Sequence, residues 1–219
     1  MKNKIQNRML LITTLLCILP FIYGSFFYSQ LPERMATHFS LNDQADGYSS
    51  KAMAVYGIPS ILLVTNIIVS IALDSDPRRK KKQKLTTLVK FLIPLIGNFC
   101  SLLILSYALG KYFPIGRITM SLISVIMLIM GNYLPTCKQN YTIGFRLPWT
   151  LDNEENWNHT HRLAGWVWTI GSLVMLFCCI FLGKAYAVVS IIGISLMTLI
   201  PILYSYGFFL KMRNSQRNS

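Results

Sequence analysis

The chain has 219 residues, of which 53% are hydrophobic and only 13% are charged, and its formal net charge is +13. A soluble domain is about a quarter charged, so this composition excludes an ordinary soluble protein. A strongly basic chain can indicate nucleic-acid binding. Here the basic residues fall between long apolar runs, so membrane topology explains them better, and we predict no direct contact with nucleic acid.

Apolar runs of about twenty residues recur along the chain, and this length crosses a ~30 Å hydrocarbon core. We therefore predict an all-α integral membrane protein. It is a six-helix transmembrane bundle with a short extracytoplasmic lid loop and a cytoplasmic loop between the fourth and fifth helices. The last two spans are joined only by Gly183-Lys184, which predicts an antiparallel pair. The predicted spans cover residues 9–28, 52–73, 88–109, 115–134, 163–182 and 185–207.

The first apolar run follows a basic N-terminal segment, so a cleaved signal peptide is the alternative to a retained span. A signal peptide has an apolar core of about 7–15 residues that ends at a small-residue cleavage site. Here the run is longer and continues into Phe26-Phe27-Tyr28. We therefore predict that this span is retained.

The distribution of basic residues predicts the orientation, because short loops rich in Lys and Arg lie in the cytoplasm. Sixteen of the 21 Lys and Arg residues fall on one side of the predicted spans. This places both termini and the loop 135–162 in the cytoplasm, and the loop 29–51 outside. We divide the chain into an N-terminal membrane region, residues 1–109, with a basic cytoplasmic loop at 74–87, and a second module, residues 110–219.

Polar and kinking residues within the spans carry further information. No Asp or Glu lies in any predicted span, and Lys90 and Arg117 lie only near span ends. Coupled transporters place ionisable groups near the midplane, so this pattern argues against coupled transport. Amides such as Asn66 and Asn98 predict hydrogen bonds between helices. Proline removes a helix hydrogen bond and tends to kink the helix, which a membrane helix tolerates when neighbours satisfy the freed carbonyl. Four spans contain a proline: Pro20, Pro59, Pro94 and Pro201.

A basic patch lies between the second and third predicted spans. We attribute it to topology and to attraction by anionic lipid, which contributes about 1 kcal/mol per charge. Docking of a cytoplasmic partner is the alternative. The patch consists of Arg78, Arg79, Lys80, Lys81, Lys82 and Lys84.

The outer loop 29–51 contains a short extended segment, Met35–Phe39, and a turn region, Asn42–Gly47, that ends in Asp46-Gly47. We expect a compact hairpin-like lid over the helix ends. A metal site or pH sensor at His38 would need partner residues, so we interpret this histidine as an ordinary surface residue.

The cytoplasmic loop is the longest polar interruption of the chain. We expect an irregular connector over Asn140–Pro148, with a turn at Gly144 and with Arg146 available to clamp an anion or a carboxylate. Proline disfavours helix at Leu147. A helix then begins near Asp152, because Asp152 and Glu155 have the spacing of a capping box.

Helical spacing after Asp152 brings aromatic and polar residues to one side. Trp157, His161, Ala164 or Gly165, and Trp168 share a face. The alternative for Trp149, Trp157 and Trp166 is an aromatic belt at the membrane interface.

The chain offers no recognisable catalytic or metal-binding pattern. His159 and His161 are two residues apart and diverge on a helix. We find no nucleophile with a paired base and no phosphate-binding glycine loop. The five cysteines show no CxxC spacing. We therefore expect no enzyme activity, no cofactor and no metal.

Several segments resemble one family of bacterial multi-pass membrane proteins, the SdpI family. The most specific part is Ile143-Gly144-x-Arg146-x-Pro148-Trp149-Thr150-Leu151. The outer loop, with Leu31-Pro32, His38-Phe39 and Asp46-Gly47-Tyr48 before Lys51, resembles the small domain of unknown function that often precedes the SdpI module. The other matching segments are Gly131-Asn132-Tyr133-Leu134-Pro135, Asn140-Tyr141-Thr142, Glu155-Asn156-Trp157 and Thr160-His161-Arg162.

The resemblance implies a protein of the bacterial cell membrane related to the immunity protein of the sporulation-delay toxin system. Such a protein protects its cell from a secreted toxic peptide, and it sequesters a cognate ArsR-like transcriptional repressor at the membrane. We assign a partner- or toxin-response motif to Asn140, Gly144, Arg146, Pro148, Trp149, Thr150, Glu155, Trp157, His161 and Arg162. An outer-loop motif comprises Pro32, His38, Asp46 and Gly47.

Two other functional classes are alternatives to immunity. A small transporter or efflux component predicts a substrate flux. A ligand-free structural or stress-related membrane protein predicts that substitutions in the cytoplasmic loop are tolerated.

Overall fold

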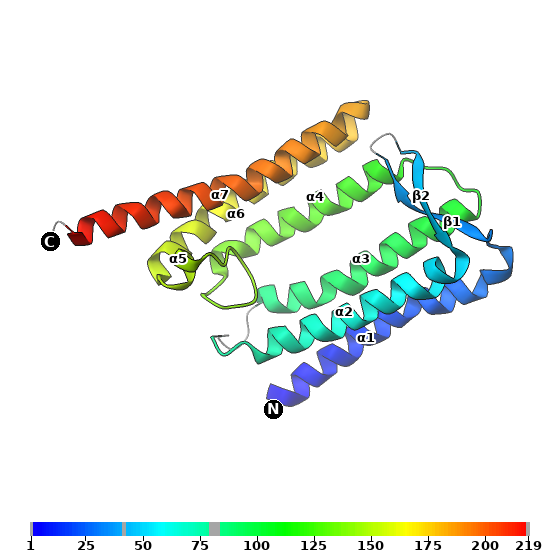
Figure 1. Ribbon diagram of the computed structural model, residues 1–219, viewed down its shortest axis with the longest axis horizontal. Helices are drawn as coiled ribbons and strands as arrows, with labels where there is room; N and C mark the ends of the chain where they lie inside the picture. The colour runs from blue at the N-terminus through cyan, green and yellow to red at the C-terminus, as the bar shows by residue number, and fades with distance from the viewer. Residues whose placement is uncertain (1, 41–42, 79–83, 218–219) are drawn as a thin grey trace. The chain divides into compact units, whose positions relative to one another are not determined.

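The computed structural model describes residues 2–40, 43–78 and 84–217, and within them it has six helices long and apolar enough to cross a membrane (Figure 1). This finding confirms the six-span integral membrane fold. The last helix continues ten residues past the predicted end at residue 207. The six helices are α1 (Lys2–Phe26), α2 (Ile58–Ser75), α3 (Lys84–Ala108), α4 (Ile115–Tyr133), α6 (Glu154–Phe181) and α7 (Tyr186–Arg217).

The chain forms two compact units. Unit 1 comprises Met1–Ser75 and Thr87–Thr119, and unit 2 comprises Asp76–Thr86 and Met120–Ser219. The division of the chain at residues 109 and 110 stays a prediction.

Unit 1 turns apolar side chains outward, as a membrane requires. Leu11, Ile22 and Ile68 are each more than half exposed, whereas Thr13 and Asn66 are fully buried. The amide of Asn66 on α2 donates to Thr13 Oγ1 on α1 at 3.3 Å. Polar contacts between helices therefore lie inside the unit, where lipid cannot compete with them.

Two of the prolines are compensated by side chains from a neighbouring helix. Pro20 cannot donate to the carbonyl of Leu16, one turn earlier, and Asn98 Nδ2 of α3 donates to this oxygen at 2.9 Å. Pro201 likewise frees the carbonyl of Met197, and Trp168 Nε1 of α6 donates to it at 2.9 Å. These bonds satisfy backbone groups that lipid would leave unpaired.

Proline 59 is accommodated differently. A π-helical turn, η2 (Met53–Gly57), lies just before it at the start of the second span. Such a turn shifts the backbone bonds from i+4 to i+5 partners. Pro59 has no N–H to donate to the carbonyl of Val55, four residues earlier. The π-helical turn contains Val55 and therefore lies where this carbonyl would otherwise be unpaired.

A buried ion pair joins α2 to α3. Lys90 lies six residues inside α3, its side chain is completely buried, and its ammonium lies 2.6 Å from Asp74 Oδ2. Asp74 is the penultimate residue of α2 and lies within the second apolar span. The expectation that Lys90 marks only a span end, and that acidic residues lie outside the spans, was therefore wrong at this point. Each residue lies near a helix terminus, where hydropathy alone does not fix the span boundary.

The outer loop forms an antiparallel hairpin of β1 (Arg34–Phe39) and β2 (Ala45–Ser50). Met35 is 2% exposed and packs in a cluster with Leu31, Val55 and Leu105, so the hairpin covers helix ends of unit 1. The expected hairpin-like lid is confirmed. Asp46 and Gly47, which were expected to end the turn region, instead lie within β2.

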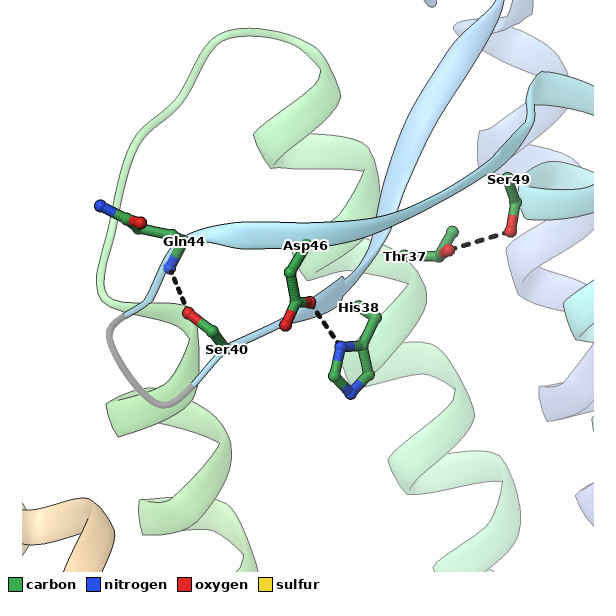
Figure 2. A network of polar contacts seen from close by, with 6 residues as sticks. All are labelled: Thr37, His38, Ser40, Gln44, Asp46 and Ser49. Carbon is green, nitrogen blue, oxygen red and sulfur yellow. Dashed lines mark hydrogen bonds and ion pairs between the residues drawn. The ribbon is translucent and has the colours of Figure 1, made fainter.

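Two side-chain pairs cross this hairpin, as Figure 2 shows: Thr37 with Ser49 and His38 with Asp46. In addition, Ser40 Oγ accepts the backbone N–H of Gln44. A register irregularity at His38 places Gly47 opposite it, and a Cβ on Gly47 would lie 2.7 Å from the Cβ of His38. The glycine is therefore needed for close approach of the two strands.

In unit 2, α6 and α7 lie side by side and are joined by the short turn η4 (Gly183–Ala185) (Figure 1). This confirms the predicted antiparallel pair. α4 packs closely on α6, because a Cβ on Gly131 would lie 2.9 Å from the backbone nitrogen of Thr169. A short 3-10 turn, η3 (Leu134–Thr136), follows α4 and leads into the loop that precedes α6.

Candidate functional site

The motif loop, residues 137–151, is built around one buried amide. Asn140 is 2% exposed. Its Nδ2 donates to the carbonyl oxygens of Lys138 and Ile143 at 2.8 and 3.1 Å. Its Oδ1 accepts the backbone N–H groups of Thr142 and Ile143 at 2.9 and 2.6 Å. One side chain thus supplies the pairing that a regular element would provide, and an asparagine is required because both donor and acceptor are used.

The turn at Gly144 docks on His161 of α6. Gly144 has a φ of +110°, and a Cβ there would overlap His161 Nε2, so the predicted turn glycine is confirmed. The imidazole is 1% exposed. Its Nε2 accepts the N–H of Phe145 at 3.1 Å, and its Nδ1 contacts the carbonyl of Trp157 at 2.8 Å. A backbone N–H can only donate and a carbonyl oxygen can only accept. These two contacts therefore assign the neutral imidazole tautomer with the proton on Nδ1.

The end of the motif loop is closed by Thr150, which is fully buried. Its hydroxyl donates to the carbonyl of Phe145 at 2.7 Å and accepts the N–H of Leu147 at 2.9 Å. Leu147 is extended, as expected before Pro148, and Pro148 begins the short helix α5 (Pro148–Leu151).

Helix α6 begins later than expected. Its N-cap is Asn153, whose Oδ1 accepts the N–H of Asn156 at 2.7 Å. Asp152 instead ends α5. The expectation of a cap at Asp152 was wrong, because the helix that Pro148 starts ends there and leaves the next residue extended.

The predicted face of α6 is confirmed as the buried one. Trp157 and Ala164 are fully buried and His161 is 1% exposed. The indole of Trp157 donates to the carbonyl of Cys137 at 2.8 Å and stacks on His161 with ring centroids 4.0 Å apart. Trp157 therefore does not belong to an interfacial belt, whereas Trp166, at 66% exposed, fits that interpretation.

Trp149 anchors the motif loop on α7. Its Nε1 donates to Ser205 Oγ at 3.0 Å, and its ring contacts those of Tyr206 and Phe209. Asn156 donates to the carbonyl of the same Ser205 at 3.0 Å. The role of Ser205 was missed, because a lone serine in an apolar span carries no sequence signal.

Asp76 is a second residue that sequence reasoning missed. Its carboxylate is 7% exposed and accepts the N–H groups of Arg78 and Tyr141 and the hydroxyl of Thr142, at 2.8–2.9 Å. It therefore fixes the segment after α2 against the motif loop. The available signal was Asp76-Pro77, a pair that favours a turn.

The assigned motif residues thus fall into two groups. Asn140, Thr150, Trp157 and His161 are buried, and Gly144 lies against His161, so these residues shape the loop. Arg146, Pro148, Glu155 and Arg162 are exposed. Arg146 donates to the carbonyl of Tyr141 at 2.7 Å, and no carboxylate contact of its guanidinium is found within the described residues. The residues open to a partner are therefore a minority of the motif.

The thiol of Cys137 is enclosed under the loop. Burial raises the pKa of the Cys137 thiol to about 11, and donation from Asn140 opposes the shift. The thiol is therefore protonated at neutral pH and is a poor nucleophile.

The outer-loop motif is only partly assembled. His38, Asp46 and Gly47 lie together, whereas Pro32 is exposed and precedes β1. His38 has a carboxylate partner in Asp46, which the sequence interpretation had not foreseen.

Of the basic patch, Arg78 and Lys84 are exposed, and Arg79, Lys80, Lys81 and Lys82 lie outside the described residues. His159 and His161 diverge as expected, since His159 is exposed and stacks on Phe208. Within residues 2–40, 43–78 and 84–217, no group of three or more His, Cys, Asp or Glu is placed to hold a metal.

Comparison with known proteins matches this part of the chain to a family. The model of the SdpI/YfhL protein family covers residues 136–205, which include the motif loop, α6 and most of α7. The resemblance to the SdpI family is confirmed. A domain of unknown function (DUF1648) matches residues 15–63, which include the hairpin and precede the segment that matches the SdpI/YfhL family.

The SdpI resemblance extends along the whole chain. The chain is 26% identical to the Immunity protein SdpI of Bacillus subtilis (strain 168) over 207 residues, which cover 94% of this chain and 98% of that protein. No solved structure matches the chain with significance. Six apolar helices and this similarity make it a multi-pass protein of the cell membrane.

Proposed function

We propose that this protein is a membrane immunity protein that protects its cell from a secreted toxic peptide. The observation that carries the proposal is the similarity to an immunity protein over 94% of the chain. A match of that extent includes both the hairpin and the motif loop.

The finer proposal is that the protein is a receptor that sequesters a cognate ArsR-like repressor at the membrane. Exposed polar residues in two regions support this proposal. The hairpin offers His38 and Asp46, and the second region offers Arg146 in the motif loop and Glu155 and Arg162 on α6. Basic loop residues favour the cytoplasm for the motif loop, where a repressor would be met.

Survival of a toxin-sensitive bacterium tests immunity. Cells that express the protein are challenged with the sporulation-delay peptide and with any secreted peptide encoded beside the gene. We expect protection by the natural sequence and by Lys138→Ala, an exposed residue of the same loop, and reduced protection by Arg146→Ala. Membrane insertion of each variant is checked by fractionation. Full sensitivity despite insertion would contradict immunity to the tested peptides, and full protection by Arg146→Ala would exclude Arg146 as a working contact.

Repressor capture is tested separately. An ArsR-like repressor encoded beside the gene should sediment with membranes that contain the protein when toxin is present, and remain soluble when Arg146 and Arg162 are both changed to Ala. A repressor that stays soluble in every case would leave immunity standing and remove the receptor function.

One observation favours transport as a second candidate function. Lys90 and Asp74 form a buried ion pair near the ends of α3 and α2, and ionisable residues within membrane spans are candidates for ion or proton pathways. Vesicles that contain the protein and a pH-sensitive dye test it: a proton flux lost in Lys90→Met would favour transport, and identical leak rates with and without protein would exclude proton movement.

A further inference from the structure

Two arginines of unit 2, Arg78 and Arg146, converge on one exposed tyrosine of the motif loop. The guanidinium carbon of Arg78 lies 4.4 Å from the ring centroid of Tyr141, over its face. Arg146 Nη1 donates to the carbonyl oxygen of the same Tyr141 at 2.7 Å. Both arginines are exposed, and so is the tyrosine, at 43%. We call these three residues the arginine cluster.

The arginine cluster is held in place before any ligand arrives. Arg78 Nη1 donates to the carbonyl of Leu151 at 2.9 Å, and its backbone N–H donates to Asp76. Stacking on an aromatic face further restricts the guanidinium plane. A cation that is already oriented loses less side-chain entropy when it binds an anion.

Most of the donors in the arginine cluster are unused. A guanidinium has five N–H donors, and the contacts above use one from each arginine. Within the described chain neither guanidinium forms an ion pair with a carboxylate. The nearby Asp76 carboxylate is buried and accepts backbone N–H groups and a hydroxyl instead. The cluster therefore presents two forks that match an oxyanion.

The position along the chain puts the arginine cluster at the membrane surface. Arg78 is three residues past Ser75, the last residue of the second apolar span. Three residues reach at most about 11 Å, and the interfacial layer is roughly 5–8 Å deep on each side of the hydrocarbon core. Arginine side chains near span ends extend into this layer.

We propose that the arginine cluster binds the phosphate of an anionic phospholipid headgroup. The two guanidinium forks donate to phosphate oxygens, and the acyl chains extend into the bilayer beside the helices. Charge complementarity and location select this occupant, because anionic headgroups already surround the site at high local concentration. The proposal does not depend on the immunity function, since it concerns the resting protein in its membrane.

Lipid titration tests the proposal on the full chain purified in detergent. Phosphatidylglycerol or phosphatidylcholine is added, and retained lipid is counted by native mass spectrometry. We expect phosphatidylglycerol to be retained preferentially. Arg78→Gln and Arg146→Gln should each weaken its binding about fivefold. Arg162→Gln, which removes an exposed arginine outside the cluster, should retain wild-type binding.

Three outcomes would overturn the proposal. The first is equal retention of the two lipids. The second is an equal loss of binding in Arg162→Gln, which would indicate only diffuse charge attraction. The third is full competition by millimolar inorganic phosphate, which would assign the site to a soluble anion. Should one glutamine variant fail to fold, lipid retention by the other still tests the proposal. Tyr141→Leu is an independent test of the same site, because it removes the stacking surface and keeps both charges.

An acidic protein segment is the competing occupant. A repressor pull-down that depends on Arg78 and Arg146, with lipid retention unchanged in both variants, would assign the arginine cluster to that partner and exclude the lipid site. Survival under toxin challenge is not needed for either measurement, so failure of the lipid site and failure of immunity are separable.

Discussion

The hairpin and the motif loop are both polar segments between membrane helices, yet they are held in opposite ways. In the hairpin, antiparallel backbone pairing sets the fold, and the side chains of His38 and Asp46 remain 74% and 46% exposed. In the motif loop the backbone is irregular, and buried side chains such as Asn140 and Thr150 supply the hydrogen bonds. Backbone pairing tolerates many residues, whereas a side-chain frame requires particular ones.

This difference bears on the motif in the segment that matches the SdpI/YfhL family. Its most distinctive residues are those that the loop needs in order to fold, and only a few are open to a partner. In this irregular loop, most motif residues therefore have a structural role, and only a few are available to contact a partner. Substitutions in the two regions should separate these roles.

Trp157→Ala should have the largest effect. The change removes a fully buried indole that bonds to Cys137 and stacks on His161. We expect the free energy of unfolding in detergent to fall by about 4 kcal/mol. Titration with a denaturing detergent, followed by circular dichroism, measures it. The matched control is Trp166→Ala, at a lipid-facing position, which should change little; equal losses would show that burial does not distinguish the two tryptophans.

Asn140→Ala should rank second. The variant leaves the buried N–H of Ile143 and the carbonyl of Lys138 without their partner. We expect a loss of about 3 kcal/mol in the free energy of unfolding, measured in the same titration. Asn158→Ala, at an exposed position of α6, should lie within about 0.5 kcal/mol of the natural sequence. Asn140→Asp keeps the acceptor and loses the donors, so a result equal to alanine would show that the donors carry the effect.

The Cys137 thiol makes the stability of the motif loop depend on pH. Its pKa is about 11 in the folded protein and about 9 when unfolded. The folded state therefore binds its proton more tightly, so the contribution is complete below pH 9 and is lost as pH rises through 11. The loss should reach about 3 kcal/mol. Cys137→Ser has no group that titrates there, so the difference between the two pH profiles isolates the thiol; parallel profiles would contradict the assignment.

His38→Ala should have the smallest effect. Its ion pair with Asp46 is exposed, and such pairs contribute little. We expect a change within about 0.5 kcal/mol in the free energy of unfolding. Met35→Ala in the same strand removes a side chain that is 2% exposed and should cost about 2 kcal/mol or more. A large loss at His38 would show that side chains, and not backbone pairing, hold the hairpin.

The sequence predicted the membrane spans well, because a length of apolar residues is a local property. It also predicted the buried face of α6, since Trp157, His161 and Ala164 follow helical spacing. The predicted last span ends at residue 207, and α7 continues beyond it to Arg217 through a polar segment that hydropathy does not register.

Contacts between distant residues were beyond local reasoning. Asp76 and Tyr141 are 65 residues apart, and the choice of Asn153 as N-cap depends on the short helix that precedes it. The roles of the buried motif residues likewise depend on which element they face. The spacing of residues along the chain does not show which distant residues come into contact.

The proline contacts have a consequence for the order in which the protein is made. Met197 finds its donor on Trp168, a residue that the ribosome has already delivered to the membrane. Leu16 depends on Asn98, which is 82 residues later. Until α3 is inserted, the first span therefore carries an unpaired carbonyl within lipid, at a cost that only the later helix removes. The first span therefore reaches its final hydrogen bonding only after the third span has been inserted.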